Sequence, residues 1–142
     1  MIKILLDTNI ILDIALKREP HFENSAEIFK LIEKYAIEAY ISATSVNDIY
    51  YIARKEKGNE AARAFITGLV GFVTIAGISR QTVMNALQSE IADFEDALQN
   101  YAAIETDCDY IITRNKSDFR HADIIVLTPT EFIASVNDIL KA

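Results

Sequence analysis

The sequence has few of the residues that build disulfides or zinc sites. Its 142 residues include one cysteine, Cys108, and two histidines in loops without the spacing of metal ligands. A single cysteine excludes an internal disulfide and a cysteine-built metal site. Cys108 lies between two aspartates beside a predicted strand, and we interpret it as a small packed residue rather than a nucleophile.

Glycine and proline are also scarce, with 4 and 2 residues, whereas 51% of the residues are hydrophobic. This composition argues against long disordered linkers, and the length predicts one domain over residues 1–142. The N-terminal apolar run is broken at Asp7, too early for a signal peptide, and no later run is long enough to span a membrane. We therefore expect a cytoplasmic protein without membrane association.

Positive charge is in deficit, because 14 lysines and arginines face 21 aspartates and glutamates, for a net charge of −7. That sign is wrong for a protein that holds nucleic acid by bulk electrostatics. Any contact with phosphate must come from a local basic patch or from bound cations.

Short apolar runs alternate with amphipathic segments along the whole chain. The runs predict five strands, at residues 2–6, 39–41, 71–75, 110–113 and 124–127. The remaining segments predict a short helix after Asp7 and further helices at residues 22–36, 45–56, 60–69, 79–90, 93–106 and from Pro129 onward. This alternation predicts an α/β fold, a three-layer α/β/α sandwich with a five-stranded, mostly parallel sheet.

The first strand ends at a carboxylate. Asp7 follows the run Ile4-Leu5-Leu6, at the edge where open α/β sheets bind their ligands. Thr8 or Asn9 can cap the helix that follows. Asp7 alone could be a turn or cap residue, but other carboxylates return to the same edge.

Three more aspartates also lie just after predicted strands or near the starts of predicted helices. Asp48 lies one turn into the helix after the second strand, Asp96 in the first turn of helix 93–106, and Asp118 after the fourth strand. In a parallel sheet all of them can converge on one cleft. Such an oxygen-only set suits Mg²⁺ or Mn²⁺, which can activate water and stabilise an in-line phosphoryl displacement. Asp93 can share a helix face with Asp96 or simply cap the helix, whereas Glu95, rotated by about 100°, is expected to face solvent.

Three blocks resemble the PIN-domain ribonucleases, which include the VapC-like toxins of toxin–antitoxin pairs. They are Leu5-Leu6-Asp7-Thr8-Asn9, Asp93-Phe94-Glu95-Asp96-Ala97-Leu98-Gln99 and Ile112-Thr113-Arg114-Asn115-Lys116-Ser117-Asp118-Phe119. The resemblance implies that Asp7, Asp96 and Asp118 bind the metal. It also implies supporting roles for Asn115 and Thr113, and that Asn9 orients Asp7.

One position departs from the family pattern, since Asp48 stands where the family usually has a longer glutamate. It still supplies a carboxylate but reaches about one methylene less. Around Asp118 lie three basic residues that we predict to contact substrate phosphate: Arg114, Lys116 and Arg120.

The sequence thus favours a metal-dependent endoribonuclease that uses Mg²⁺ or Mn²⁺. The resemblance implies a type II toxin with an antitoxin partner and a homodimeric state. The alternative is a catalytically inactive PIN-like module that binds protein or RNA partners. A receiver-like phosphoacceptor is a weaker third possibility, because that site normally needs a strand-end lysine and Arg114 is a poor substitute.

Overall fold

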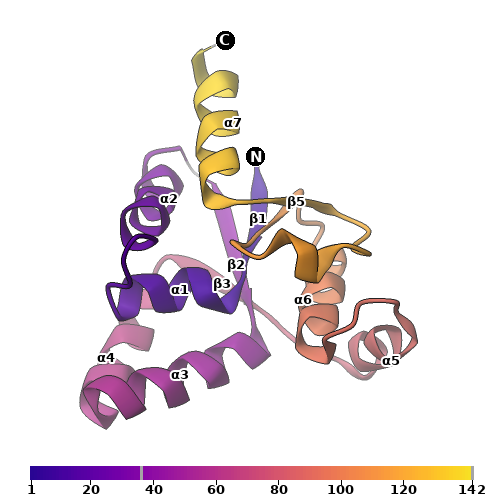
Figure 1. Cartoon of the computed structure of the whole chain (residues 1–142), viewed down its shortest axis with the longest axis horizontal. Helices are drawn as coiled ribbons and strands as arrows, with labels where there is room; N and C mark the ends of the chain where they lie inside the picture. Colours follow the sequence, from indigo (N-terminus) through magenta and orange to yellow (C-terminus); the bar gives the residue numbers. More distant parts are fainter. Residues whose placement is uncertain (36, 142) are drawn as a thin grey trace.

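The computed structural model describes residues 1–35 and 37–141, and its centre is a single sheet (Figure 1). The strands follow the order β3-β2-β1-β4-β5, and every neighbouring pair is parallel. Their bounds are Lys3–Leu6 for β1, Glu38–Ser42 for β2, Val73–Ala76 for β3, Tyr110–Ile112 for β4 and Ile125–Leu127 for β5. The predicted five-stranded parallel sheet is confirmed, with the first strand at its centre.

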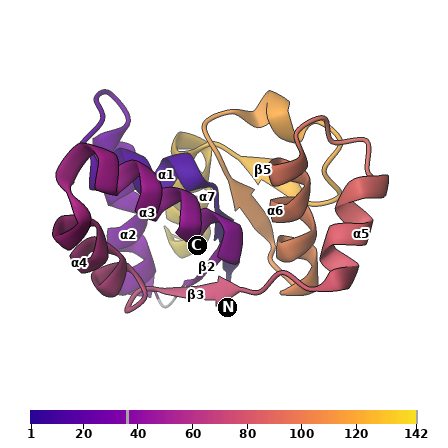
Figure 2. The same ribbon diagram turned by 90° about the horizontal axis from the view of Figure 1, so that it is seen from below.

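Helices cover both faces of this sheet (Figures 1 and 2). On one side lie α1 (Thr8–Ala15), α2 (Phe22–Tyr35), α3 (Ala43–Lys57), α4 (Asn59–Leu69) and α7 (Pro129–Lys141). On the other side lies α6 (Phe94–Glu105), against which α5 (Arg80–Gln88) packs. The predicted three-layer arrangement is confirmed. Ala36, the predicted end of the second helix, lies outside the described residues.

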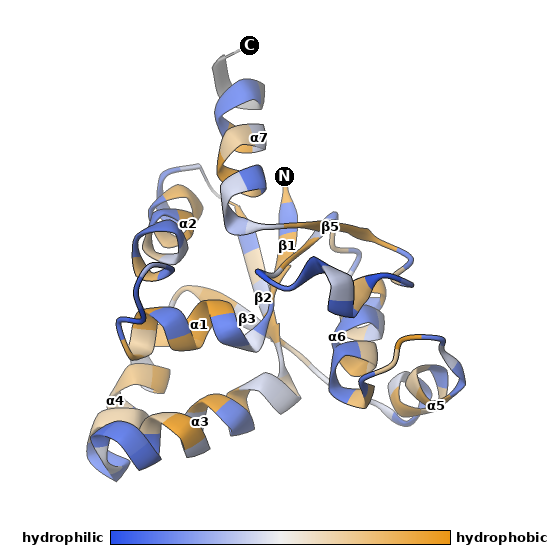
Figure 3. Ribbon diagram, in the orientation of Figure 1, coloured by the Kyte–Doolittle hydropathy of each residue, from blue (hydrophilic) through white to orange (hydrophobic). Residues whose placement is uncertain are grey.

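The central strand is buried on both faces. Ile4 and Leu6 pack with Ile10, Ile28 and other residues of the first helical layer, whereas Leu5 faces the layer of α6. Figure 3 shows mainly hydrophilic colour on the loop between β4 and β5, in contrast to the mostly hydrophobic β1. None of the helices in the described part of the chain is long and apolar enough to cross a membrane.

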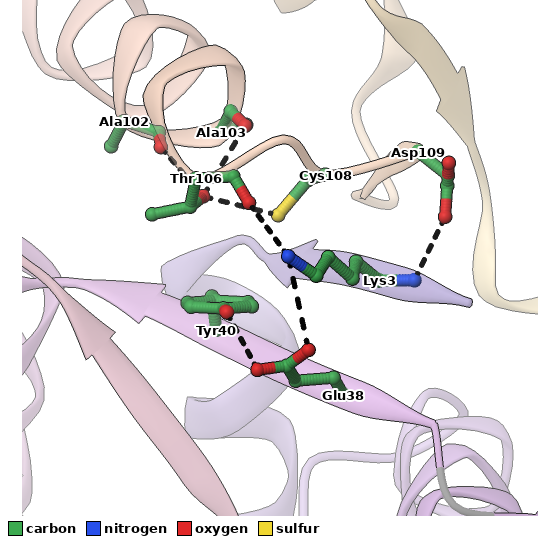
Figure 4. A network of polar contacts seen from close by, with 8 residues as sticks. All are labelled: Lys3, Glu38, Tyr40, Ala102, Ala103, Thr106, Cys108 and Asp109. Atoms are coloured by element: carbon green, nitrogen blue, oxygen red, sulfur yellow. Dashed lines mark hydrogen bonds and ion pairs between the residues drawn. The ribbon is translucent and has the colours of Figure 1, made fainter. Parts of the chain in front are cut away.

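A polar network fixes the amino ends of the central strands (Figure 4). The Lys3 amide donates a hydrogen bond to Asp109 Oδ2 at 2.9 Å, and the Lys3 Nζ lies 3.9 Å from Glu38 Oε2. The Tyr40 hydroxyl donates to Glu38 Oε1 at 2.7 Å. Cys108 lies beside this network and is buried, and burial raises the pKa of its thiol. The predicted packing role of Cys108 is thus supported.

At the opposite edge of the sheet, where the strands end, hydrogen bonds at the first residues of the helices connect neighbouring elements. Ser42 caps α3, its Oγ accepting from the Ser45 amide at 3.2 Å. The prediction that Thr8 or Asn9 caps the first helix is wrong, because Asp7 holds the cap position and the helix begins at Thr8. The Thr8 hydroxyl instead forms a 2.7 Å hydrogen bond with Ser45 Oγ. This buried contact joins α1 to α3, so the two helices have a fixed relation at the edge where the acidic residues gather.

A short 3₁₀ helix, η1 (Lys116–Phe119), follows β4 and was not expected from the sequence. Phe119 at its end is buried in the cluster formed with α6, whereas Asp118 is exposed. Burial of Phe119 therefore anchors the loop that carries Asp118 beside α6.

Candidate active site

Carboxylates from four elements line one cavity of about 200 Å³ at the carboxyl edge of the sheet, which we call the acidic cavity. Asp7 comes from the end of β1, Asp48 from α3, Asp96 from the first turn of α6 and Asp118 from η1. The cavity wall also includes Asn9, Asp93, Glu95, Gln99 and Asn115. The structure thus places all four predicted acids together; their role as metal ligands stays a prediction.

Asp7 is held by neutral donors and is only 6% exposed. Thr113 Oγ1 donates to its Oδ2 at 2.8 Å, and Gln99 Nε2 donates to its Oδ1 at 3.1 Å. Although Asp7 occupies the cap position of α1, its side chain makes no capping hydrogen bond. The carboxylate is therefore held at the cavity instead of closing the helix end.

These contacts give Thr113 the supporting position expected of it, but the hydrogen bonds to Asp7 come from Thr113 and Gln99 and not from Asn9. The Asn9 side-chain oxygen instead accepts from Arg18 at 3.5 Å. The backbone amide of Asn115 donates to Thr113 Oγ1 at 3.1 Å. This hydrogen bond orients the hydroxyl that donates to Asp7. Gln99 was not singled out from the sequence, although its place three residues after Asp96 puts both on one helix face.

Gln99 also carries an unused acceptor. Its side chain is 1% exposed, and the oxygen Oε1 has no hydrogen-bond partner among the residues that the structure describes. Leaving a buried polar atom unpaired costs about 1–3 kcal/mol. An oxygen of this kind, beside carboxylates, is a suitable ligand or neighbour for a hard cation or its bound water.

The prediction that Glu95 faces solvent is wrong. Its side chain is partly buried, lines the acidic cavity and lies within hydrogen-bonding reach of Asp48. Burial first, then the hydrogen bond with Asp48 and the nearby acidic charges, raises the pKa of Glu95 to about 8. The cavity wraps around the start of α6, so two residues that differ by about 100° in helical angle both face it.

The pKa of Asp96 is raised as well. Burial, followed by the charges of Asp7, Asp93 and Asp118, raises the pKa of Asp96 to about 7. Asp93 caps α6, its side chain accepting from the Asp96 amide at 3.0 Å. The capping interpretation of Asp93 is therefore supported, and its carboxylate also stands on the cavity wall.

The carboxylates line the cavity without meeting at one point. In the described part of the chain, no three histidine, cysteine, aspartate or glutamate side chains stand close enough together to hold a metal ion as arranged. Like charges repel, which opposes closer approach of these groups without a counter-charge. The donors are all oxygens and include the unpaired Gln99 oxygen, a set that fits Mg²⁺ or Mn²⁺ better than zinc.

Two of the three predicted phosphate contacts have other partners. Arg114 pairs with Asp13 through hydrogen bonds of 2.9 and 3.3 Å, and Asp13 is fully buried. Lys116 pairs with Glu131 at 3.1 Å. Partners distant in sequence thus take up the charges of Arg114 and Lys116, and the predicted contact of both residues with substrate phosphate stays a prediction. Arg120 instead lines an adjoining cavity of about 160 Å³ with Asp93, Asp96 and Asp118, where it can meet a phosphate.

Comparison with known proteins agrees with this fold and site. A PIN domain profile matches residues 3–117, so the chain belongs to the PIN domain family. Ribonuclease VapC1 of Aquifex aeolicus (strain VF5) is 27% identical over 135 residues, covering 92% of each chain. The predicted family membership is confirmed.

Solved structures with the same fold include chains from toxin–antitoxin complexes. VapBC2 from Rickettsia felis, bound to a DNA fragment from its promoter, has a chain with a TM-score of 0.73 and 18% identity, over 89% of this chain and 98% of that one. A toxin–antitoxin complex from Klebsiella pneumoniae has a chain with a TM-score of 0.66 and 25% identity, over 88% of this chain and 96% of that one.

The pairing of Arg114 predicts a structural effect. Among the described residues, Arg114→Met leaves the buried Asp13 carboxylate with the longer ion pair to Arg18, at 3.8 Å, so we expect the free energy of unfolding to fall by about 3 kcal/mol. Lys116→Met is the control, because its pair with Glu131 is half exposed and should matter little. Urea unfolding measures both, and equal effects would contradict the structural role of Arg114.

The raised pKa values of Glu95 and Asp96 predict that stability falls with rising pH. Between their ordinary values near 4 and about 7–8, the folded state holds more protons than the unfolded state, so the free energy of unfolding falls across that range. Thermal unfolding in a chelator at pH 5 to 8 should show this fall. Asp96→Asn should flatten it, and an equal pH dependence in the variant would contradict the assignment.

Proposed function

We propose that this PIN domain is a cytoplasmic endoribonuclease that hydrolyses RNA phosphodiester bonds with Mg²⁺ or Mn²⁺. The observation that carries the proposal is the convergence of Asp7, Asp48, Asp96 and Asp118, from four separate elements, on one cavity at the carboxyl edge of a parallel sheet. The match to a named ribonuclease over most of the chain supports the same activity.

In this proposal the four aspartates hold the cation, and Asn115 and Asp93 stand beside them. When bound, such a cation lowers the pKa of a water molecule and offsets charge on the phosphoryl oxygens. Thr113 and Gln99 fix the Asp7 carboxylate, so that one side of the site is preorganised.

Arg120 supplies positive charge on the neighbouring wall. An RNA phosphate next to the scissile bond could contact its guanidinium while the acidic cavity holds the cation. The protein can therefore contact RNA phosphate despite its net charge of −7, because the positive charge is supplied locally by Arg120 and the cation.

We further propose that the protein is the toxin of a type II toxin–antitoxin pair, with an antitoxin protein as partner and a homodimer as its assembly. The support is the likeness of 88–89% of the chain to proteins solved within toxin–antitoxin complexes. An inactive PIN-like binding module is the second candidate, favoured by the separation of the carboxylates in the described structure.

Asp96→Asn separates these two candidates. The substitution keeps the size of the side chain but removes its charge, so cleavage of RNA should fall by orders of magnitude through lost transition-state stabilisation. Loss of a repelling charge should leave the melting temperature in chelator equal or higher. Cleavage assays and thermal unfolding on the same sample measure both effects.

Asp123→Asn is the control, because Asp123 is exposed and lies outside the acidic cavity. In the wild type, chelation should abolish cleavage, and Mg²⁺ or Mn²⁺ should restore it. A less stable but fully active Asp96→Asn protein, or cleavage that survives chelation, would refute the proposed site and favour the binding module.

A further inference from the structure

The start of α6 forms part of the wall of the acidic cavity. Two side chains lie beside each other in this cavity: Asp48 from α3 and Glu95 from α6, with their carboxyl groups within hydrogen-bonding reach. Asp48 is the shorter of the two, and it reaches one methylene less toward the centre than a glutamate would. Glu95 therefore brings a longer carboxylate to the side of the cavity where α3 offers a short one.

A separate feature of the same wall is an unpaired acceptor. Gln99 lies one turn after Glu95 on α6, lines the same cavity and is 1% exposed, and its Oε1 is without a hydrogen-bond partner among the described residues. Buried polar atoms are normally satisfied by protein groups, water or ions. This oxygen is not a carboxylate oxygen, and it lacks a donating partner among the described residues.

The described residues that line the acidic cavity include no lysine, arginine or histidine. The basic residues nearest in sequence to Asp118 are engaged elsewhere or line the adjoining cavity. Acceptor oxygens from α3, α6, η1 and the residue after β1 thus line one cavity, and no lysine, arginine or histidine stands among these described residues. These acceptor oxygens suit a divalent cation of the kind that oxygen ligands coordinate.

From these observations we propose that Glu95 is a fifth carboxylate of the cation site, which acts with Asp48 and makes up for its short reach. The inference rests on the proposed function, because it concerns the same cation. It adds to that function a residue in the first turn of α6 that takes part in holding the metal together with Asp96.

A simpler role for Glu95 is that of an acidic residue that stabilises the start of a helix through its dipole. Glu60 provides the matched comparison, since it is also an acidic residue in the first turn of a helix, α4, and is exposed and away from the cavity. If only the helix start mattered, Glu95→Gln and Glu60→Gln would behave alike.

The test is titration of the purified full chain with Mn²⁺ alone, followed by calorimetry and by electron paramagnetic resonance of free Mn²⁺. Glu95→Gln should weaken Mn²⁺ affinity roughly 10-fold or more, whereas Glu60→Gln should leave it unchanged. Thermal unfolding in chelator checks that each variant is folded. Unchanged Mn²⁺ affinity in folded Glu95→Gln would overturn the inference.

A second pair of variants tests the cooperation with Asp48. In an Asp48→Glu background the longer side chain should take over, so adding Glu95→Gln should weaken Mn²⁺ binding less than it does in the wild type. An equal loss in both backgrounds would overturn the compensation between the two residues. A wild-type chain that binds no Mn²⁺ would instead overturn the proposed function, so the two failures can be told apart.

Discussion

The structure depends on one buried negative charge. Asp7 ends the central strand, and the protein surrounds its carboxylate with two neutral donors, from Thr113 and Gln99, rather than with a lysine or arginine. Buried charges in proteins are normally paired or bound to metals. A fold that fixes this carboxylate but leaves its charge uncompensated is suited to bind a cation at that point, and the other acidic residues approach it from three further elements.

Two buried aspartates, Asp7 and Asp13, differ in whether a basic residue neutralises their charge. Asp13, six residues after Asp7, is also buried, but it is paired with Arg114 and lies close to Arg18. That pair joins α1 to the segment after β4 and thereby positions the loop that carries Asn115 and Asp118. Two aspartates of one short segment thus have opposite uses: Asp13 is neutralised to hold the structure together, and Asp7 is left available to a ligand.

Much of the fold and of the site follows from sequence because both rest on local patterns. Apolar runs of strand length gave all five strands, and the rule that parallel strands end at one edge placed the four aspartates together. The orientation of Glu95 did not follow, since helical periodicity does not tell how far a cavity wraps around a helix end. The partner of Arg114 is 101 residues away, and no local pattern identifies a contact of that kind.

Crystals grown with MnCl₂ offer the most direct view of whether a divalent cation binds among these carboxylates. An anomalous difference map recorded at the manganese absorption edge should show a peak inside the acidic cavity, between Asp7, Asp96 and Asp118. A map with no peak in that cavity, or with peaks only at other places on the molecule, would contradict the account.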